Sequence, residues 1–338
     1  MKKCIIIPDS FKGTMSALEF CQIAEKTVKR HMPGCEVLTI PVADGGEGTV
    51  DCFVCALGAE KIERSVCGPW QENVSAAYCV KDGTAFIEMA QAAGLPMVGE
   101  HKNPAKTTTF GVGSLIRDAV EQGCKSIVIG LGVVAVYRLV FEAYHGVFVN
   151  KRHAGLECLK VVSPGLELSR AVGKLLCAGS KFAFAGFERL LSGCTVTAMC
   201  DIDNPMYGAQ GAAAIFAPQK GADKEMVALL DRNLVHLGNL MQQKTGADIA
   251  NMPGAGAAGA FGAGIVAFLG GKLQSGIETV LECVRFDELL EGADMVFTGE
   301  GQMDSQSLHG KAVIGIAGRA AKKHVPVTVI AGSVGDGA

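Results

Sequence analysis

The sequence predicts an α/β fold with more than one domain. Short, apolar, β-branched segments such as residues 4–7 alternate with amphipathic helical segments, which is the pattern of parallel strands covered by helices. Clusters of glycine and carboxylate residues follow several of these strand-like segments. The chain has 338 residues, a length that is more often two domains than one.

The first β-α unit begins at the N-terminus. Residues 3–8 predict a buried strand ended by a proline, and Ser16 and Glu19 have the spacing of a capping box, so we expect a helix from there to about residue 31. Open α/β sheets bind ligands beyond the carboxyl ends of their strands. The candidates at this strand end are Asp9, Ser10 and Lys12.

The second unit carries the most distinctive stretch of the chain. A strand at residues 37–40 leads to a loop that precedes a helical pattern at residues 50–57. The loop residues are Asp44, Gly45, Gly46, Glu47 and Gly48. Two carboxylates among glycines at a helix start suit a divalent metal or a hydroxyl-rich substrate. The alternative is a tight turn in which Asp44 or Thr49 caps the helix.

The pattern changes after residue 60, where we place a domain boundary. Residues 61–89 predict antiparallel strands with a hairpin at residues 81–83. A helix is expected at residues 110–122, and a buried strand at residues 126–129 ends in a Gly-Leu-Gly sequence. Glu88 ends one of the strands, and the pattern leaves open whether it binds a ligand or is simply an exposed carboxylate.

A later strand at residues 194–200 ends in oxygen-bearing side chains. Asp201, Asp203 and Asn204 suit Mg²⁺ or a proton acceptor, although an Asx-turn before Pro205 would use the same residues. A long helix is expected at residues 225–245. The glycine-rich residues 254–264 fit either a phosphate-binding loop or close helix packing.

The last part of the chain repeats the pattern of acids among glycines. A strand at residues 294–298 is expected to lead into a loop, and a further strand lies at residues 327–330. The candidates in that loop and just beyond it are Gly299, Glu300, Gly301, Asp304, Ser307 and Lys311.

Composition limits the possible functions. A net charge of −3 gives no basic surface for nucleic acid, and no apolar run is long enough to span a membrane. No signal peptide is predicted, and the odd count of 13 scattered cysteines indicates reduced thiols in a cytoplasm. The oligomeric state is not predicted.

These motifs together resemble the glycerate kinase family. Their order and spacing carry the resemblance, which covers roughly residues 1–132 and 190–338. The matching segments are residues 8–14 (PDSFKGT), 43–49 (ADGGEGT), 87–90 (IEMA), 200–205 (CDIDNP), 211–214 (GAAA), 218–221 (PQKG) and 298–307 (TGEGQMDSQS).

The resemblance implies an enzyme that phosphorylates D-glycerate with ATP and Mg²⁺ to give 2-phosphoglycerate, although the residues themselves do not choose between the 2- and 3-hydroxyls. It also implies two α/β domains, one interrupted by the other, with a cleft between them. Our interpretation of the sequence agrees with this fold. It places residues 1–60 and 290–338 in the discontinuous domain and residues 61–289 in the inserted domain.

Phosphoryl transfer needs charge neutralisation and alignment of the acceptor hydroxyl, and from these needs we assign expected roles to the residues. Asp201 would accept the hydroxyl proton or bind the metal, and Lys12 would act with it in catalysis. Asp201, Glu300 and Asp304 are the expected metal ligands, while Asp44 and Glu47 would hold the metal or substrate hydroxyls. The expected contacts to phosphate or to the glycerate carboxylate are made by Lys12, Ser10 and Lys311.

The sequence departs from the family after Gly132. The family usually continues there with Gly-Gly-Ser-Ala-Thr-x-Asp-Gly-Gly, whereas residues 133–188 show no such pattern; a local replacement, a shifted reading frame or a mis-assigned sequence would each produce this. A C-terminal tail expected after Ala338 is also missing. Two alternatives therefore stand beside the kinase: a catalytically impaired protein that binds nucleotide and hydroxy acid, and a kinase for another small sugar acid.

Overall fold

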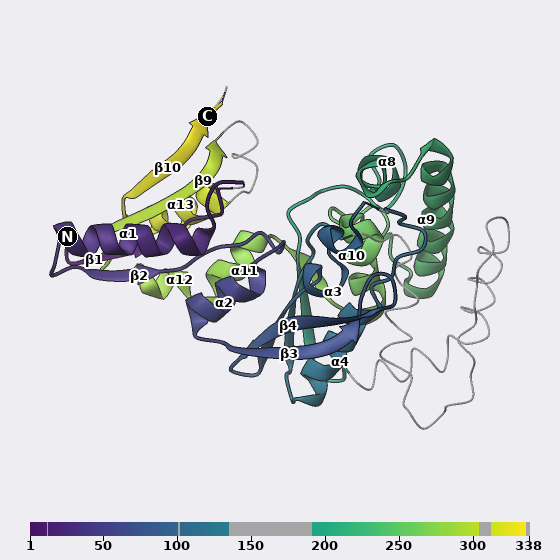
Figure 1. Cartoon of the computed structure of the whole chain (residues 1–338), viewed down its shortest axis with the longest axis horizontal. Coiled ribbons are helices and arrows are strands. Elements are labelled where there is room, and N and C mark those ends of the chain that lie inside the picture. The colour runs from purple at the N-terminus through teal and green to yellow at the C-terminus, as the bar shows by residue number, and fades with distance from the viewer. Residues whose placement is uncertain (12, 101, 135–190, 304–311, 336–338) are drawn as a thin grey trace.

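The fold is built on two separate β-sheets. The computed structural model of the chain describes residues 1–11, 13–100, 102–134, 191–303 and 312–335. One sheet has four strands in the order β10-β9-β1-β2, and the other has six in the order β3-β4-β5-β6-β7-β8. Figure 1 shows the sheet that contains both chain ends on the left and the larger sheet, with its helices, on the right.

All strands of the four-stranded sheet are parallel. They are β1 (Lys3–Ile6), β2 (Glu36–Thr39), β9 (Met295–Met303) and β10 (Val327–Val334). Helix α1 (Ala17–His31) covers one face through a cluster that contains Ile6 and Phe20. Ser16 and Glu19 form the predicted capping box, so the predicted start of this helix is confirmed.

The six-stranded sheet is mixed, as the change of pattern after residue 60 predicts. Strand β4 pairs antiparallel with β3 and β5, whereas the pairs from β5 to β8 are parallel. Its strands are β3 (Glu60–Cys67), β4 (Asn73–Lys81), β5 (Thr84–Glu88), β6 (Ser126–Gly130), β7 (Thr195–Met199) and β8 (Lys272–Gln274).

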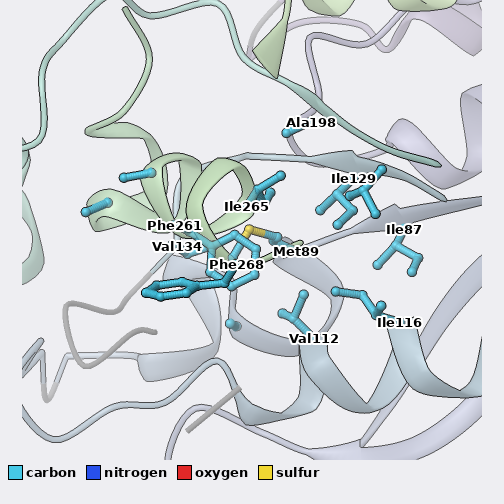
Figure 2. Packing of buried hydrophobic residues seen from close by; sticks show 14 of the residues in the cluster. Ile87, Met89, Val112, Ile116, Ile129, Val134, Ala198, Phe261, Ile265 and Phe268 are labelled. Atoms are coloured by element: carbon cyan, nitrogen blue, oxygen red, sulfur yellow. The ribbon is translucent and has the colours of Figure 1, made fainter. Parts of the chain in front are cut away.

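Helices cover one face of this sheet around a large apolar core. Figure 2 shows Ile87 and Ile129 of neighbouring strands lying toward Ile116 of α4 and Ile265 of α10. The elements on this side are α3 (Ala90–Ala93), η1 (Leu95–Val98), α4 (Phe110–Glu121), α8 (Ala212–Phe216), η2 (Pro218–Lys220), α9 (Lys224–Thr245) and α10 (Ala257–Leu269). The glycine-rich residues 254–264 therefore run into a buried helix, where the small residues permit close packing.

A second apolar layer joins the two sheets. Its helices are α2 (Thr49–Leu57), α11 (Gly276–Cys283), α12 (Phe286–Leu289) and α13 (Ala312–Lys322). The layer contains Ile5 and Val296 from the small sheet and Val128 from the large one, and the rings of Phe53 and Phe86 stack with centroids 4.0 Å apart. The chain thus forms the expected two α/β parts with the first one discontinuous; the bounds at residues 60 and 290 stay a prediction.

Two local expectations are wrong. Gly299, Glu300 and Gly301 lie inside strand β9 rather than in a loop, because β10 pairs with β9 as far as Met303. Helix α2 is capped by neither of the predicted side chains, since its N-cap is Gly48 in the left-handed region, with φ 90°.

No helix in the described ranges is both long and apolar enough to cross a bilayer. Residues 135–190, which include most of the departure from the family pattern, lie outside the described residues.

Candidate active site

A cavity of ≈ 1470 Å³ brings together loops from both sheets. Asp9 and Ser10 reach it from the end of β1, the loop after β2 supplies part of its wall, and Asp201 follows β7. The predicted site residues among its described lining are Asp9, Ser10, Asp44, Gly46, Glu47, Gly48 and Asp201. Carboxylates from three separate strand ends therefore share one space.

The loop after β2 is held by its own hydrogen bonds. The Gly46 N–H donates to Asp44 Oδ1 at 3.1 Å, and Thr49 Oγ1 donates to the Gly46 carbonyl at 2.6 Å. Gly45 and Gly48 have φ of 88° and 90°, a region that side chains other than glycine rarely adopt. This backbone leaves Asp44 and Glu47 exposed to the cavity.

The same loop packs directly on the ends of β6 and β7. A Cβ atom at Gly130 would lie 2.3 Å from the Gly45 carbonyl oxygen, and one at Gly132 would lie 2.9 Å from the Gly46 Cα. Glycine is therefore required on both sides of the contact. The Gly-Leu-Gly sequence at the end of β6 gives no local sign of this role in holding the loop.

Asp201 is fixed by groups that the sequence did not indicate. Its Oδ1 accepts a hydrogen bond from the Ser275 hydroxyl at 3.0 Å and another from the Gly276 N–H at 2.9 Å. Crowding by surrounding protein atoms raises the pKa of Asp201, these two hydrogen bonds lower it, and the charge of Asp44 raises it further. Ser275 precedes a helix far away in sequence, so nothing local predicts this pairing.

The end of β1 is tied to β9. The Asp9 N–H donates to the Gly299 carbonyl at 2.8 Å, and the Ser10 N–H donates to Asp9 Oδ1 at 2.6 Å. Gly299 thus supports the Asp9 loop through its backbone and is absent from the described lining of the cavity.

Other predicted residues lie away from the described cavity wall. Asn204 stabilises a turn, because its amide donates to the Gln210 carbonyl at 2.8 Å. Glu300 is buried in β9, and its Oε1 has no hydrogen-bond partner among the described residues. Gly45 is buried beneath its loop, and Gly301 lies in β9. Lys12, Asp304, Ser307 and Lys311 lie outside the described residues.

Glu88 is not the exposed carboxylate that the sequence left open as one of two alternatives. It is fully buried, and its Oε2 accepts a hydrogen bond from the Val50 N–H at 3.2 Å at the start of α2. Burial raises the pKa of Glu88, while hydrogen bonds from the backbone of Val50 and Gly48 and from Gln91 oppose the rise. Glu88 therefore positions the loop that carries Asp44 instead of contacting the cavity.

The donor set of the cavity fits Mg²⁺ bound jointly with a substrate. No group of three or more His, Cys, Asp or Glu side chains within the described ranges is arranged to hold a metal. Asp44 and Asp201 nevertheless line the same cavity with like charges close enough to interact. Because Mg²⁺ commonly takes one or two carboxylates plus phosphate oxygens, these two side chains would be sufficient protein ligands.

Comparison with known proteins identifies the family. A sequence profile described as the glycerate kinase family matches residues 4–338. The chain is 40% identical over 344 residues to the glycerate 2-kinase of Escherichia coli strain K12, covering 99% of this chain and 86% of that protein. It is also 40% identical over 338 residues to the glycerate kinase of Bacillus cereus, covering 98% of this chain and 85% of that protein.

A solved structure agrees. The crystal structure of a provisionally named glycerate kinase 2 from Salmonella typhimurium LT2 superposes with a TM-score of 0.80 at 34% identity, covering 99% of this chain and 90% of that one. Profile, sequence relatives and fold point to the same group, and the cavity carries the acidic loops by which the sequence resembles it. The chain belongs to the glycerate kinase family.

Proposed function

We propose that this protein transfers the γ-phosphoryl group of ATP to the 2-hydroxyl of D-glycerate, giving 2-phosphoglycerate and ADP. The observation that carries the proposal is the shared cavity of Asp44 and Asp201 in a chain of this family. The choice of the 2-hydroxyl rests on the name of the Escherichia coli relative.

Asp201 is the proposed proton acceptor. Its Oδ1 is occupied by Ser275 and Gly276, so Oδ2 is the oxygen left to accept the proton of the glycerate hydroxyl. As that proton leaves, the hydroxyl oxygen bonds to the γ-phosphorus, the bond from phosphorus to the β–γ bridging oxygen breaks, and ADP departs. A carboxylate with a raised pKa is the better base, because its affinity for the proton is higher.

Phosphoryl transfer depends mainly on alignment and charge neutralisation. We propose that Asp44 would hold Mg²⁺, which when bound neutralises charge on the phosphate oxygens, while Asp201 stays free to accept the proton. Asp9, Ser10, Glu47 and the backbone of Gly46 and Gly48 would orient the acceptor and the phosphates from the same wall.

The remaining predicted ligands stay proposals. Glu300 is buried, and its Oε1 has no partner among the described residues, which is compatible with a bound cation. Lys12, Asp304, Ser307 and Lys311 keep their expected roles toward metal, phosphate or carboxylate, and Gly299 and Asn204 would act through the loops they support. Gly301, in β9, keeps its expected role as a binding residue.

We also propose a cytoplasmic location. No disulfide joins the cysteines that the structure describes, and most of their side chains are buried or half-buried. Thiols kept in this state suit a reducing compartment.

The test is turnover by the full chain with ATP, Mg²⁺ and D-glycerate. We expect ADP release that requires glycerate, and a phosphorus NMR signal of 2-phosphoglycerate. Nucleotide binding without glycerate-dependent ADP release would favour a binding protein that has lost turnover. ADP release only with a different hydroxy acid would identify a kinase for another small sugar acid, and either result would contradict the proposal.

A further inference from the structure

The start of helix α11 is bonded to Asp201 instead of being capped by its own serine. Ser275 is the N-cap of this helix, and a serine at that position usually accepts a hydrogen bond from the first turn. Its side chain makes no such bond here. The Ser275 hydroxyl donates to Asp201 Oδ1 at 3.0 Å, and the Gly276 N–H donates to the same oxygen at 2.9 Å. The carboxylate of Asp201 therefore takes the place of a cap at the start of α11.

The absence of a side chain at Gly276 makes room for the other oxygen of Asp201. A Cβ atom at Gly276 would lie 2.6 Å from Asp201 Oδ2 and 3.2 Å from the Asp44 carbonyl oxygen. The first distance is well inside the separation at which non-bonded heavy atoms pack, so a side chain here would displace the carboxylate. Gly276 thus lies against both Asp201 and the backbone of the Asp44 loop.

Helix α11 is a firm support for these contacts. Ile277, Val280 and Leu281 are buried in the apolar layer that joins the two sheets. Arg319 of α13 also pairs with Glu278 of this helix at 2.5 Å. Because the interior is close-packed, the start of α11 cannot shift far without disturbing the contact between the sheets.

We propose that Ser275 and Gly276 are positioning residues for phosphoryl transfer, which hold the carboxylate of Asp201 in the orientation that accepts the proton of the hydroxy acid. This inference rests on the proposed function, because it takes Asp201 as the proton acceptor. An unrestrained aspartate side chain samples several rotamers, and two hydrogen bonds to one of its oxygens select one of them. A base acts only within hydrogen-bond reach of the proton that it removes, so a misplaced carboxylate lowers kcat.

The first test compares Ser275→Ala with wild type in steady-state kinetics with ATP, Mg²⁺ and D-glycerate. The variant loses one hydrogen bond to a charged group, so we expect kcat to fall by roughly 10-fold. The KM values for both substrates should stay at the wild-type level, because the hydroxyl orients the proton acceptor and binds neither substrate. Ser275→Thr keeps the hydroxyl and should recover most of the lost kcat.

Ser114→Ala is the matched control. Ser114 is half-buried in α4, its hydroxyl donates to the Phe110 carbonyl at 3.3 Å, and it is not among the described lining residues of the cavity. This variant also loses one hydroxyl hydrogen bond, but no bond to Asp201. Its kcat should therefore equal that of wild type.

Gly276→Ala tests the second contact while leaving the Ser275 hydroxyl in place. The φ of Gly276 lies outside the left-handed region, so alanine is compatible with the backbone. The added methyl group would meet the end of a flexible side chain, so we expect a lower kcat with only a small change in Tm. Wild-type kcat in Ser275→Ala or in Gly276→Ala would overturn the inference. So would a raised KM with unchanged kcat, because the residue would then act in substrate binding.

A double-mutant cycle with Asp201→Ala shows whether Ser275 acts through Asp201. If it does, the losses in kcat of Ser275→Ala and Asp201→Ala should not add in the double variant, and additive losses would contradict the inference. Urea unfolding of the same variants measures the coupling of the two side chains without any turnover. A wild-type chain without glycerate-dependent ADP release would contradict the proposed function, whereas additive changes in the free energy of unfolding would contradict the contact between Ser275 and Asp201. The two failures are therefore distinguishable.

Discussion

At the scale of single residues, the site depends on side chains that never touch the cavity. The carboxylate of Glu88 accepts a hydrogen bond from the Val50 N–H in the first turn of α2, where backbone N–H groups have no partner within the helix. Ser275 and Gly276 fix Asp201 as donors: both donate hydrogen bonds to its carboxylate, which faces the cavity. The positions of Asp44 and Asp201 are thus set by residues from distant parts of the sequence.

The raised pKa of Glu88 predicts how stability changes with pH. The folded state holds the Glu88 proton more tightly than the unfolded state, so this group contributes stability at low pH that is lost as pH rises above the ordinary glutamate value of about 4.3. Glu88→Gln removes that contribution. The stability of the variant relative to wild type should therefore improve between about pH 5 and about pH 8.

Urea unfolding at the two pH values measures this difference. Glu63→Gln is the control, because Glu63 is exposed in β3 and should show no such trend. A Glu88→Gln variant that loses stability relative to wild type as pH rises would show that the buried carboxylate is ionised and stabilising, contrary to the account.

At the scale of elements, the long helix α9 shows how a cap and an apolar face act together. Asp223 is its N-cap and accepts a hydrogen bond from the Met226 N–H at 2.8 Å. Leu230, Leu234 and Leu237 form the buried face behind it. The sequence predicted this helix to within one residue because its amphipathic pattern is a local signal.

Removing this cap should lower stability without affecting the site. Asp223→Ala leaves the first-turn donors without their side-chain acceptor and should cost about 1 kcal/mol in the free energy of unfolding. Asp223→Asn keeps an acceptor and should change stability by only a few tenths of a kcal/mol. Urea unfolding of both variants gives the comparison, and equal losses would rule out a capping role for the Asp223 side chain.

Strand β9 shows where local signals are insufficient. Glycines and a carboxylate after residue 298 are typical of a loop, yet residues 299–303 continue the strand because β10 pairs with them. Pairing between strands distant in sequence cannot be read from the composition of either strand. The same reason explains why the burial of Glu88 and the partners of Asp201 were not predicted.

At the scale of the whole molecule, the site exists because the two sheets meet. Gly45 belongs to the loop after β2 of the small sheet, and Gly130 ends β6 of the large one. Their backbones touch so closely that neither position has room for a side chain. The family motifs gave the fold class and the acidic loops, whereas this contact depends on the assembled structure.

A methyl group at that junction should disturb both stability and activity. Gly130→Ala places a Cβ atom 2.3 Å from the Gly45 carbonyl oxygen, so the backbone must shift. We expect a loss of roughly 1 to 3 kcal/mol in stability and reduced turnover. Gly318→Ala is the control, because its Cβ atom meets nothing within 4 Å in helix α13.

The control should gain roughly 0.5 to 1 kcal/mol, since alanine is the better helix former. Thermal unfolding and ADP release measured on both variants separate the two effects. Wild-type stability in Gly130→Ala would mean that the Asp44 loop does not pack on the end of β6.

The domain bounds remain a proposal at this scale. We propose residues 1–60 with 290–338, and residues 61–289, as the two units, which agrees with the division of strands between the sheets. Helix α11, before residue 290, packs against α13 as well as against β7, and the two sheets share one apolar layer. This layer joins the sheets around the cavity rather than leaving them as separate bodies.

The most direct test of the account is the turnover number of Asp201→Asn with ATP, Mg²⁺ and D-glycerate. Asparagine can still accept the hydrogen bonds of Ser275 and Gly276 but is not a base. We predict a fall in kcat of roughly 10²- to 10⁴-fold with an unchanged Tm. A folded Asp201→Asn variant with wild-type kcat would contradict the central claim that Asp201 accepts the proton during phosphoryl transfer.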